Sequence, residues 1–157
     1  MKTVPRARRL RRLRFWILLP ALAMILFDLG LTMYFQPQEY WQVSYDLTSE
    51  RSPIGTFLLS FHPNAFLAFM FAYISVITLL VFWLPGPWHK IISLALVVGH
   101  TAGVYSWISH RSYWSVILIF IVVAAFTEFS WQRAELLSRY NNVPVFEGRS
   151  KNRQVNR

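Results

Sequence analysis

Long apolar stretches alternate with shorter polar connections along this chain of 157 residues. Four such stretches cover residues 15–35, 63–84, 91–109 and 113–131. A helix of about 20 residues crosses the hydrocarbon core of a bilayer, and a helix satisfies its own backbone hydrogen bonds in lipid. The pattern therefore predicts an all-α fold, a four-helix transmembrane bundle.

The first connection, residues 36–62, is the longest piece between two spans. Ser52 is a favoured helix N-cap, and Pro53 suits the first helical position after it. The apolar residues that follow share one helical face: Ile54, Phe57, Leu58 and Phe61. This amphipathic pattern predicts a short helix lying in the membrane interface, after which Pro63 starts the second span.

The other two connections are only a few residues long. Pro85-Gly86-Pro87 predicts a tight turn between the second and third spans, and residues 110–112 join the third span to the fourth. Short connections usually join neighbouring, antiparallel helices. Spans two and three, and likewise three and four, are therefore predicted to pack side by side.

The basic residues are distributed unevenly between the two sides of this bundle. Fourteen of the 16 Lys and Arg residues lie in residues 1–14, at Lys90 and in residues 132–157, and only Arg51 and Arg111 lie in the other two connections. A basic excess in short loops marks the cytoplasmic side of a membrane protein. Both termini are therefore predicted to be cytoplasmic, in a multi-pass protein of a bacterial inner membrane.

This topology divides the chain into three parts. Residues 1–14 form a basic cytoplasmic arm, residues 15–131 form the four-span membrane domain, and residues 132–157 form a basic cytoplasmic tail that is expected to be disordered. The first connection then lies outside the cytoplasm.

Composition narrows the possible partners and cofactors. The formal net charge of +9 is divided between two tails that flank apolar spans, so attraction to anionic lipid explains it, and nucleic acid is not a predicted partner. The absence of cysteine excludes disulfides, thiolate catalysis and Cys-ligated clusters. The histidines follow no recognised ligand spacing, so no metal or other cofactor is predicted.

Two ionisable residues lie deep in the predicted spans, Asp28 in the first and His100 in the third. Such groups cost about 2.5–3.5 kcal/mol at the bilayer centre, so they usually face inward and are paired. A rise of about 1.5 Å per residue places the two at depths that differ by only about 4 Å. We expect them to meet, with Thr32 on the same face as Asp28. The contact is either a structural clamp or a site for a proton, an ion or a small ligand.

Small residues recur at one-turn spacing in the third span. Gly99 and Gly103 form a GxxxG pair that Ala95 extends by one turn. Such a ridge lets another helix approach closely. The predicted role of Ala95, Gly99 and Gly103 is packing within the bundle, with dimerisation as the alternative.

Four segments of the chain resemble a family of small bacterial multi-pass membrane proteins whose function is unknown. The segments are FDLGLTMYFQPQEYW, ERSPIG, FHPNAF and GHTAG. The matching positions are Asp28, Thr32, Glu50, Pro53, His62, Pro63 and His100. The chain departs from the family at Ser52, where the pattern has Asn. The resemblance implies that Asp28, Glu50, His62 and His100 form one outward-facing polar cluster.

These features favour a non-enzymatic membrane protein that acts by binding or assembly through the polar cluster Asp28, Thr32, Glu50, His62 and His100, with no catalytic residue assigned. Its predicted partners are the lipid bilayer and a membrane protein or a second copy of the chain. One alternative is a proton- or ion-coupled transporter working as an oligomer, and another is an intramembrane enzyme using Asp28 and His100 as acid and base. A cavity lined by ionisable groups would favour these alternatives, whereas a dry, closed Asp28–His100 contact would favour the first reading.

Overall fold

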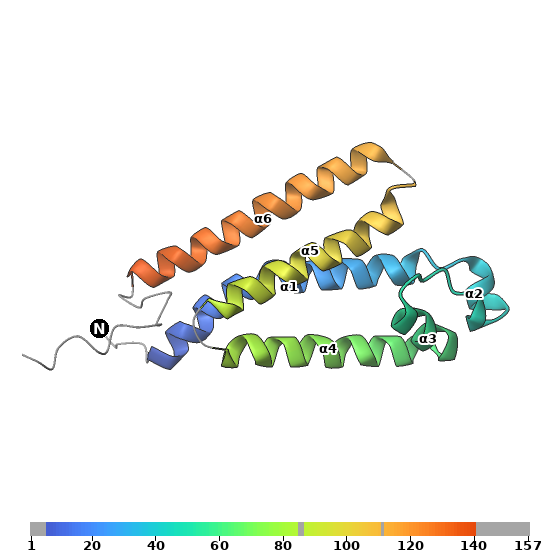
Figure 1. The fold of residues 1–157 in the computed structure, drawn as a ribbon, viewed down its shortest axis with the longest axis horizontal. Helices are drawn as coiled ribbons and strands as arrows, with labels where there is room; N and C mark the ends of the chain where they lie inside the picture. Colours follow the sequence, from blue (N-terminus) through green and yellow to red (C-terminus); the bar gives the residue numbers. More distant parts are fainter. Residues whose placement is uncertain (1–5, 85–86, 111, 141–157) are drawn as a thin grey trace, which may run out of the picture.

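The computed structural model describes residues 6–84, 87–110 and 112–140 (Figure 1). The elements in chain order are α1 (Arg6–Tyr34), α2 (Gln38–Gln42), the 3-10 turn η1 (Tyr45–Leu47), α3 (Pro53–Phe61), α4 (Pro63–Trp83), α5 (Trp88–Ile108) and α6 (Tyr113–Tyr140). No strand occurs in the part of the chain that the structure describes. The predicted all-α class is confirmed.

Four of these helices are long and apolar enough to cross a membrane: α1 from Leu10, α4, α5, and α6 to Arg139. The chain is therefore a multi-pass membrane protein with a four-helix bundle. Helix α1 already begins at Arg6, inside the basic arm. Helix α6 continues to Tyr140, into the predicted tail. Arg, Leu, Glu and Gln are strong helix formers, which explains why both helices extend past the apolar windows. The rest of the predicted tail lies outside the described residues.

Helix α1 is the centre of the bundle. It packs most extensively against α5, then against α6 and α4. In its most apolar window 44% of the residues are buried, against 6% for α6. The pairs α4–α5 and α5–α6, which short connections predicted to pack side by side, are in contact, but these contacts are smaller than those that α1 makes with α5 and α6.

Three apolar clusters follow one another along the bundle, and the first, near the start of α1, consists of Leu13, Ile17 and Ala134. The middle cluster consists of Leu18, Ala21, Met24, Val81, Val97 and Val104. The third cluster lies toward the end that carries residues 35–62, called the loop end below, and consists of Ile25, Leu29, Tyr40, Leu59, Phe66 and Met70. The opposite end, where α1 begins and α6 ends, is called the terminal end (Figure 1).

The predicted short helix in the first connection is present as α3. The Ser52 hydroxyl accepts a hydrogen bond from the Gly55 N–H at 3.1 Å, and Pro53 occupies the first turn, as expected for this cap. The Tyr40 hydroxyl donates to the Leu59 carbonyl at 3.1 Å and so ties α2 to α3. Three of the four residues of the predicted apolar face are exposed, namely Ile54, Phe57 and Phe61.

Candidate functional site

A polar cavity lies between α1, α4 and α5 near the loop end. Its volume is about 380 Å³. Its polar lining consists of Asp28, Thr32, Glu50, Ser52, Tyr73, His100, Ser106 and Trp107. Four of the five residues of the predicted polar cluster thus border one space, called the polar cavity from here on.

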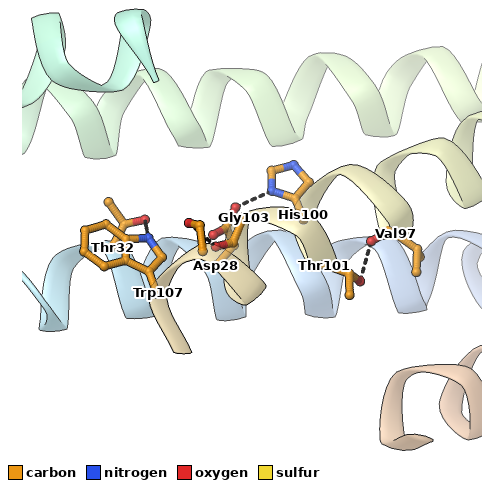
Figure 2. Close-up of polar contacts among 8 residues, drawn as sticks. Asp28, Thr32, Val97, His100, Thr101, Gly103 and Trp107 are labelled. Atoms are coloured by element: carbon orange, nitrogen blue, oxygen red, sulfur yellow. Dashed lines mark hydrogen bonds and ion pairs between the residues drawn. The ribbon is translucent and has the colours of Figure 1, made fainter. Parts of the chain in front are cut away.

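The Asp28 and His100 side chains meet in this cavity (Figure 2). Asp28 Oδ2 and His100 Nδ1 are 2.8 Å apart, and the two side chains are 18% and 17% exposed. Because a carboxylate only accepts hydrogen bonds, His100 Nδ1–H is the donor. The close packing of α1 on α5 brings the two residues together, as their similar predicted depths suggested.

Gly103 provides the space that Asp28 occupies. A Cβ atom at position 103 would lie 2.6 Å from Oδ2 and 2.7 Å from Oδ1 of Asp28. Real side chains do not approach so closely, so any residue larger than glycine would displace the carboxylate. Gly103 therefore sets the position of Asp28 against the backbone of α5, as Figure 2 shows.

The other two small residues of this ridge border the polar cavity. A Cβ atom at Gly99 would meet no heavy atom within 4 Å outside its own stretch of helix. Within the described residues, the close contact of the ridge is therefore that of Gly103 with a side chain of α1. Packing of another helix against Ala95 and Gly99, including one from a second copy of the chain, stays a prediction.

Thr32 and Trp107 close one side of the cavity. The Trp107 Nε1–H donates to Thr32 Oγ1 at 3.1 Å, and the indole stacks on Phe35 with ring centroids 6.2 Å apart. The Thr32 carbonyl accepts from the Gln36 side-chain amide at 2.9 Å. The face shared by Asp28 and Thr32 thus makes polar contacts with α5 over a full helical turn.

Gln36 and Trp107 are site residues that the sequence analysis missed. Gln36 is buried, and its Oε1 accepts from both the Thr48 hydroxyl and the Ser49 N–H at 3.0 Å. Gln36 thereby connects the end of α1 to the loop that carries Glu50. The sequence feature that could have identified Gln36 is its position one turn after Thr32, which continues the polar face of α1.

Glu50 is held in the loop by backbone groups. Its Oε1 accepts from the Ser52 N–H at 2.9 Å, and its carbonyl accepts from the Thr56 hydroxyl at 2.7 Å. A Cβ atom at Gly55 would lie 2.7 Å from Glu50 Cγ, so Gly55 makes room for this side chain. The start of α3 therefore determines where the Glu50 carboxylate lies.

A second cavity of about 240 Å³ lies beside the first and is called the vestibule. Its lining consists of Phe35, Ser49, Glu50, Arg51, Ser106, Trp107 and His110. Glu50, Ser106 and Trp107 border both spaces. The vestibule thus adjoins the polar cavity on its loop-end side.

His62 does not join the polar cluster, so its predicted place there is wrong. It lies between α3 and α4, where its Nδ1 accepts from the Asn64 N–H at 3.0 Å and caps α4. Its ring packs against Tyr45, with centroids 5.3 Å apart. The residue before Pro63 is extended, which makes His62 a cap rather than a cavity residue.

The chemistry available in the polar cavity is binding and proton exchange. The cavity offers two carboxylates, one imidazole and the aromatic side chains of Tyr73 and Trp107. The Ser106 hydroxyl donates to the Gly103 carbonyl at 2.7 Å. Within the described residues no group of three His, Cys, Asp or Glu side chains is arranged to hold a metal ion.

Comparison with known proteins adds no family to this description. No protein-family model, curated protein or solved structure matches the chain.

Proposed function

We propose that this chain is a bacterial inner-membrane protein that binds a small polar ligand in the polar cavity, entering through the vestibule from the side opposite the cytoplasm. The observation that carries the proposal is that the Asp28–His100 pair borders a cavity of about 380 Å³. A pair that served only to clamp two helices would be expected to lie in a closely packed contact.

The small residues beside the pair support a binding role. Larger apolar side chains at Ala95 and Gly99 would fill the cavity and, if the cavity holds water, would gain about 25 cal/mol for each Å² of apolar surface removed from that water. An open space lined by ionisable groups is costly for stability alone. A ligand that uses the space accounts for both features.

The proposed orientation follows from the basic residues. The terminal end carries Arg11, Arg12, Arg14, Lys90 and Arg133, whereas the described residues of the loop end contain Arg51 as their basic side chain. Lys and Arg favour the cytoplasmic leaflet. The vestibule then faces outward.

Proton- or ion-coupled transport by an oligomer is the second candidate, and the ionisable lining of the cavity favours it. Transport also needs a route to the terminal end. That direction is filled by the middle cluster, which includes Leu18, Met24 and Val97. Binding from one side requires no repacking of this cluster and is therefore the leading proposal.

Cysteine labelling tests the proposal, because the natural chain contains no cysteine. In Gly99→Cys the new thiol would lie in open space beside His100. We expect a membrane-impermeant maleimide to label it from the loop end, because thiolates form in a water-accessible cavity.

Gly30→Cys is the matched control. Gly30 lies about 3 Å in depth from Asp28. Like Gly99 it is exposed and has open space around it, but it borders neither cavity. In a bilayer it would face lipid and resist the reagent. Equal resistance at both positions, with both variants folded, would contradict the proposed access.

A further inference from the structure

We infer that the ligand of the polar cavity carries an ammonium group, supplied by a small free amine or by the headgroup of an aminophospholipid. This inference rests on the proposed function and names the ligand class of the same site. It is carried by the combination of charges, acceptors and aromatic faces around the cavity.

The charges around the polar cavity favour a cation. Asp28 contributes a carboxylate from α1 and Glu50 contributes one from the loop, while the lining contains no Lys or Arg. His100 is the lining group that can offset this charge, and even a protonated imidazole would offset only one of the two carboxylates. Charges in a poorly solvated cavity interact more strongly than in water, so an anion would be repelled.

The hydrogen-bonding groups suit an N–H donor. A carboxylate has about four acceptor positions. At Asp28 the structure gives one contact to His100, and at Glu50 one contact to the Ser52 N–H. An ammonium group brings several donors and can bond to carboxylate oxygens that these contacts leave unused.

Aromatic side chains complete a cation-binding environment. Tyr73 packs near His100, with ring centroids 6.0 Å apart, and Trp107 forms another part of the lining. Aromatic faces attract a cation within about 6 Å, and Trp is the most effective. A metal ion is a poorer occupant, since the described residues provide no three-ligand group.

The vestibule accounts for the two possible sources of the ammonium group. Arg51 and His110 border it, next to the acidic cavity. A phosphate beside Arg51 and an ammonium in the polar cavity would match a phosphatidylethanolamine headgroup. A free amine would need only the polar cavity.

The first experiment measures charge selectivity in Gly99→Cys. Trimethylammonium-ethyl methanethiosulfonate and sulfonatoethyl methanethiosulfonate each convert a thiolate to a mixed disulfide and release a sulfinate, but their charges are opposite. We expect the cationic reagent to be favoured over the anionic one more strongly at Gly99→Cys than at Ser49→Cys in the vestibule. Adding Asp28→Asn should bring the two ratios together.

The outcomes separate this inference from the proposed function. Reaction of Gly99→Cys with neither reagent would overturn the proposed access and the inference with it. Reaction with both reagents at the Ser49→Cys ratio would leave an open cavity and overturn the ammonium assignment alone.

The second experiment distinguishes the sources, with Gly99→Cys protein reconstituted in phosphatidylglycerol vesicles and labelled by neutral N-ethylmaleimide. Slower labelling with propylammonium chloride, but not with propanol, identifies a free amine. Slower labelling after adding phosphatidylethanolamine, but not phosphatidylcholine, which has no ammonium N–H, identifies the lipid. Protection in neither arm, or protection that Asp28→Asn leaves intact, would overturn the inference.

Discussion

Gly103 is the residue on which the position of the Asp28 carboxylate most directly depends. Both carboxylate oxygens lie where a Cβ atom would be, at 2.6 and 2.7 Å. Asp28 is short and is bonded to His100, so it can move away only by giving up that contact. A single methyl group at this position is therefore enough to disturb the pair.

We predict that Gly103→Ala destabilises the bundle by about 1–3 kcal/mol, the usual cost of overpacking. Gly99→Ala is the control, because its methyl group meets open space and alanine in a helix interior gains about 0.5–1 kcal/mol over glycine. Unfolding titrations in mixed detergent measure both changes. Equal effects of the two substitutions would show that Asp28 does not pack against Gly103.

The same residues show what sequence reasoning can find at this scale. The Asp28–His100 contact was predictable for two reasons. The rise per residue of a helix determines the depth of each residue in its span, and ionisable groups inside a membrane are usually paired. The position of His62 was not, because capping depends on how the chain turns before Pro63. The hydrogen bond between Trp107 and Thr32 was missed because the sequence does not distinguish a tryptophan with a bonded N–H from the other apolar residues of the span.

Among the elements, α2 and α3 make the loop end a folded unit rather than a flexible connection. Tyr40 is fully buried, and its hydroxyl donates to the Leu59 carbonyl near the end of α3. The start of α3 in turn positions Glu50 through the Ser52 N–H. The loop-end contacts and the polar cavity are therefore linked through α3.

Tyr40→Phe should destabilise the loop end by about 1 kcal/mol, because it leaves the Leu59 carbonyl without this donor. Hydrogen exchange of α2 and α3 amides measures the change, with Tyr45→Phe as the control, since the Tyr45 hydroxyl has no hydrogen bond to any of the described residues. If Tyr40→Phe leaves exchange at the wild-type rate, the bond makes no contribution.

The stability that Tyr40 provides depends on pH. Burial, with a smaller contribution from Tyr45, raises the pKa of Tyr40 above its ordinary value of 10.0. The folded state then holds the proton more tightly than the unfolded state does. The stability that Tyr40 provides is present below about pH 10 and decreases as the pH rises further, a loss that Tyr40→Phe should lessen.

The four spans were more predictable than their packing. Lipid forces long apolar segments into helices, so length and composition identify them. Connection length predicted that α4 and α5, and likewise α5 and α6, are neighbours, and both pairs are in contact, but it could not predict that α1 makes the largest contacts in the bundle. The central position of α1 depends on side-chain fit, for example the buried Ser93 hydroxyl donating to the Ile17 carbonyl at 2.6 Å.

For the molecule as a whole, the two ends differ in charge and in structure. Among the described residues, most Lys and Arg side chains lie at the terminal end, whereas the loop end carries Arg51, α2, α3 and the vestibule. Because both cavities lie near one end, the orientation of the chain in the membrane determines from which side a ligand can enter. A ligand can enter from outside only if residues 36–62 lie outside.

We predict that reporter fusions after Tyr40 or next to Ser112 report the outer side, and that fusions after Trp88 or after Tyr140 report the cytoplasm. The physical reason is the retention of Lys and Arg in the cytoplasmic leaflet. Paired alkaline phosphatase and fluorescent-protein fusions measure both sides, so each site has its own control. A cytoplasmic signal after Tyr40 would invert the topology. The vestibule, with Arg51 and His110, would then face the cytoplasm, and impermeant reagents would reach Gly99→Cys only in inside-out vesicles.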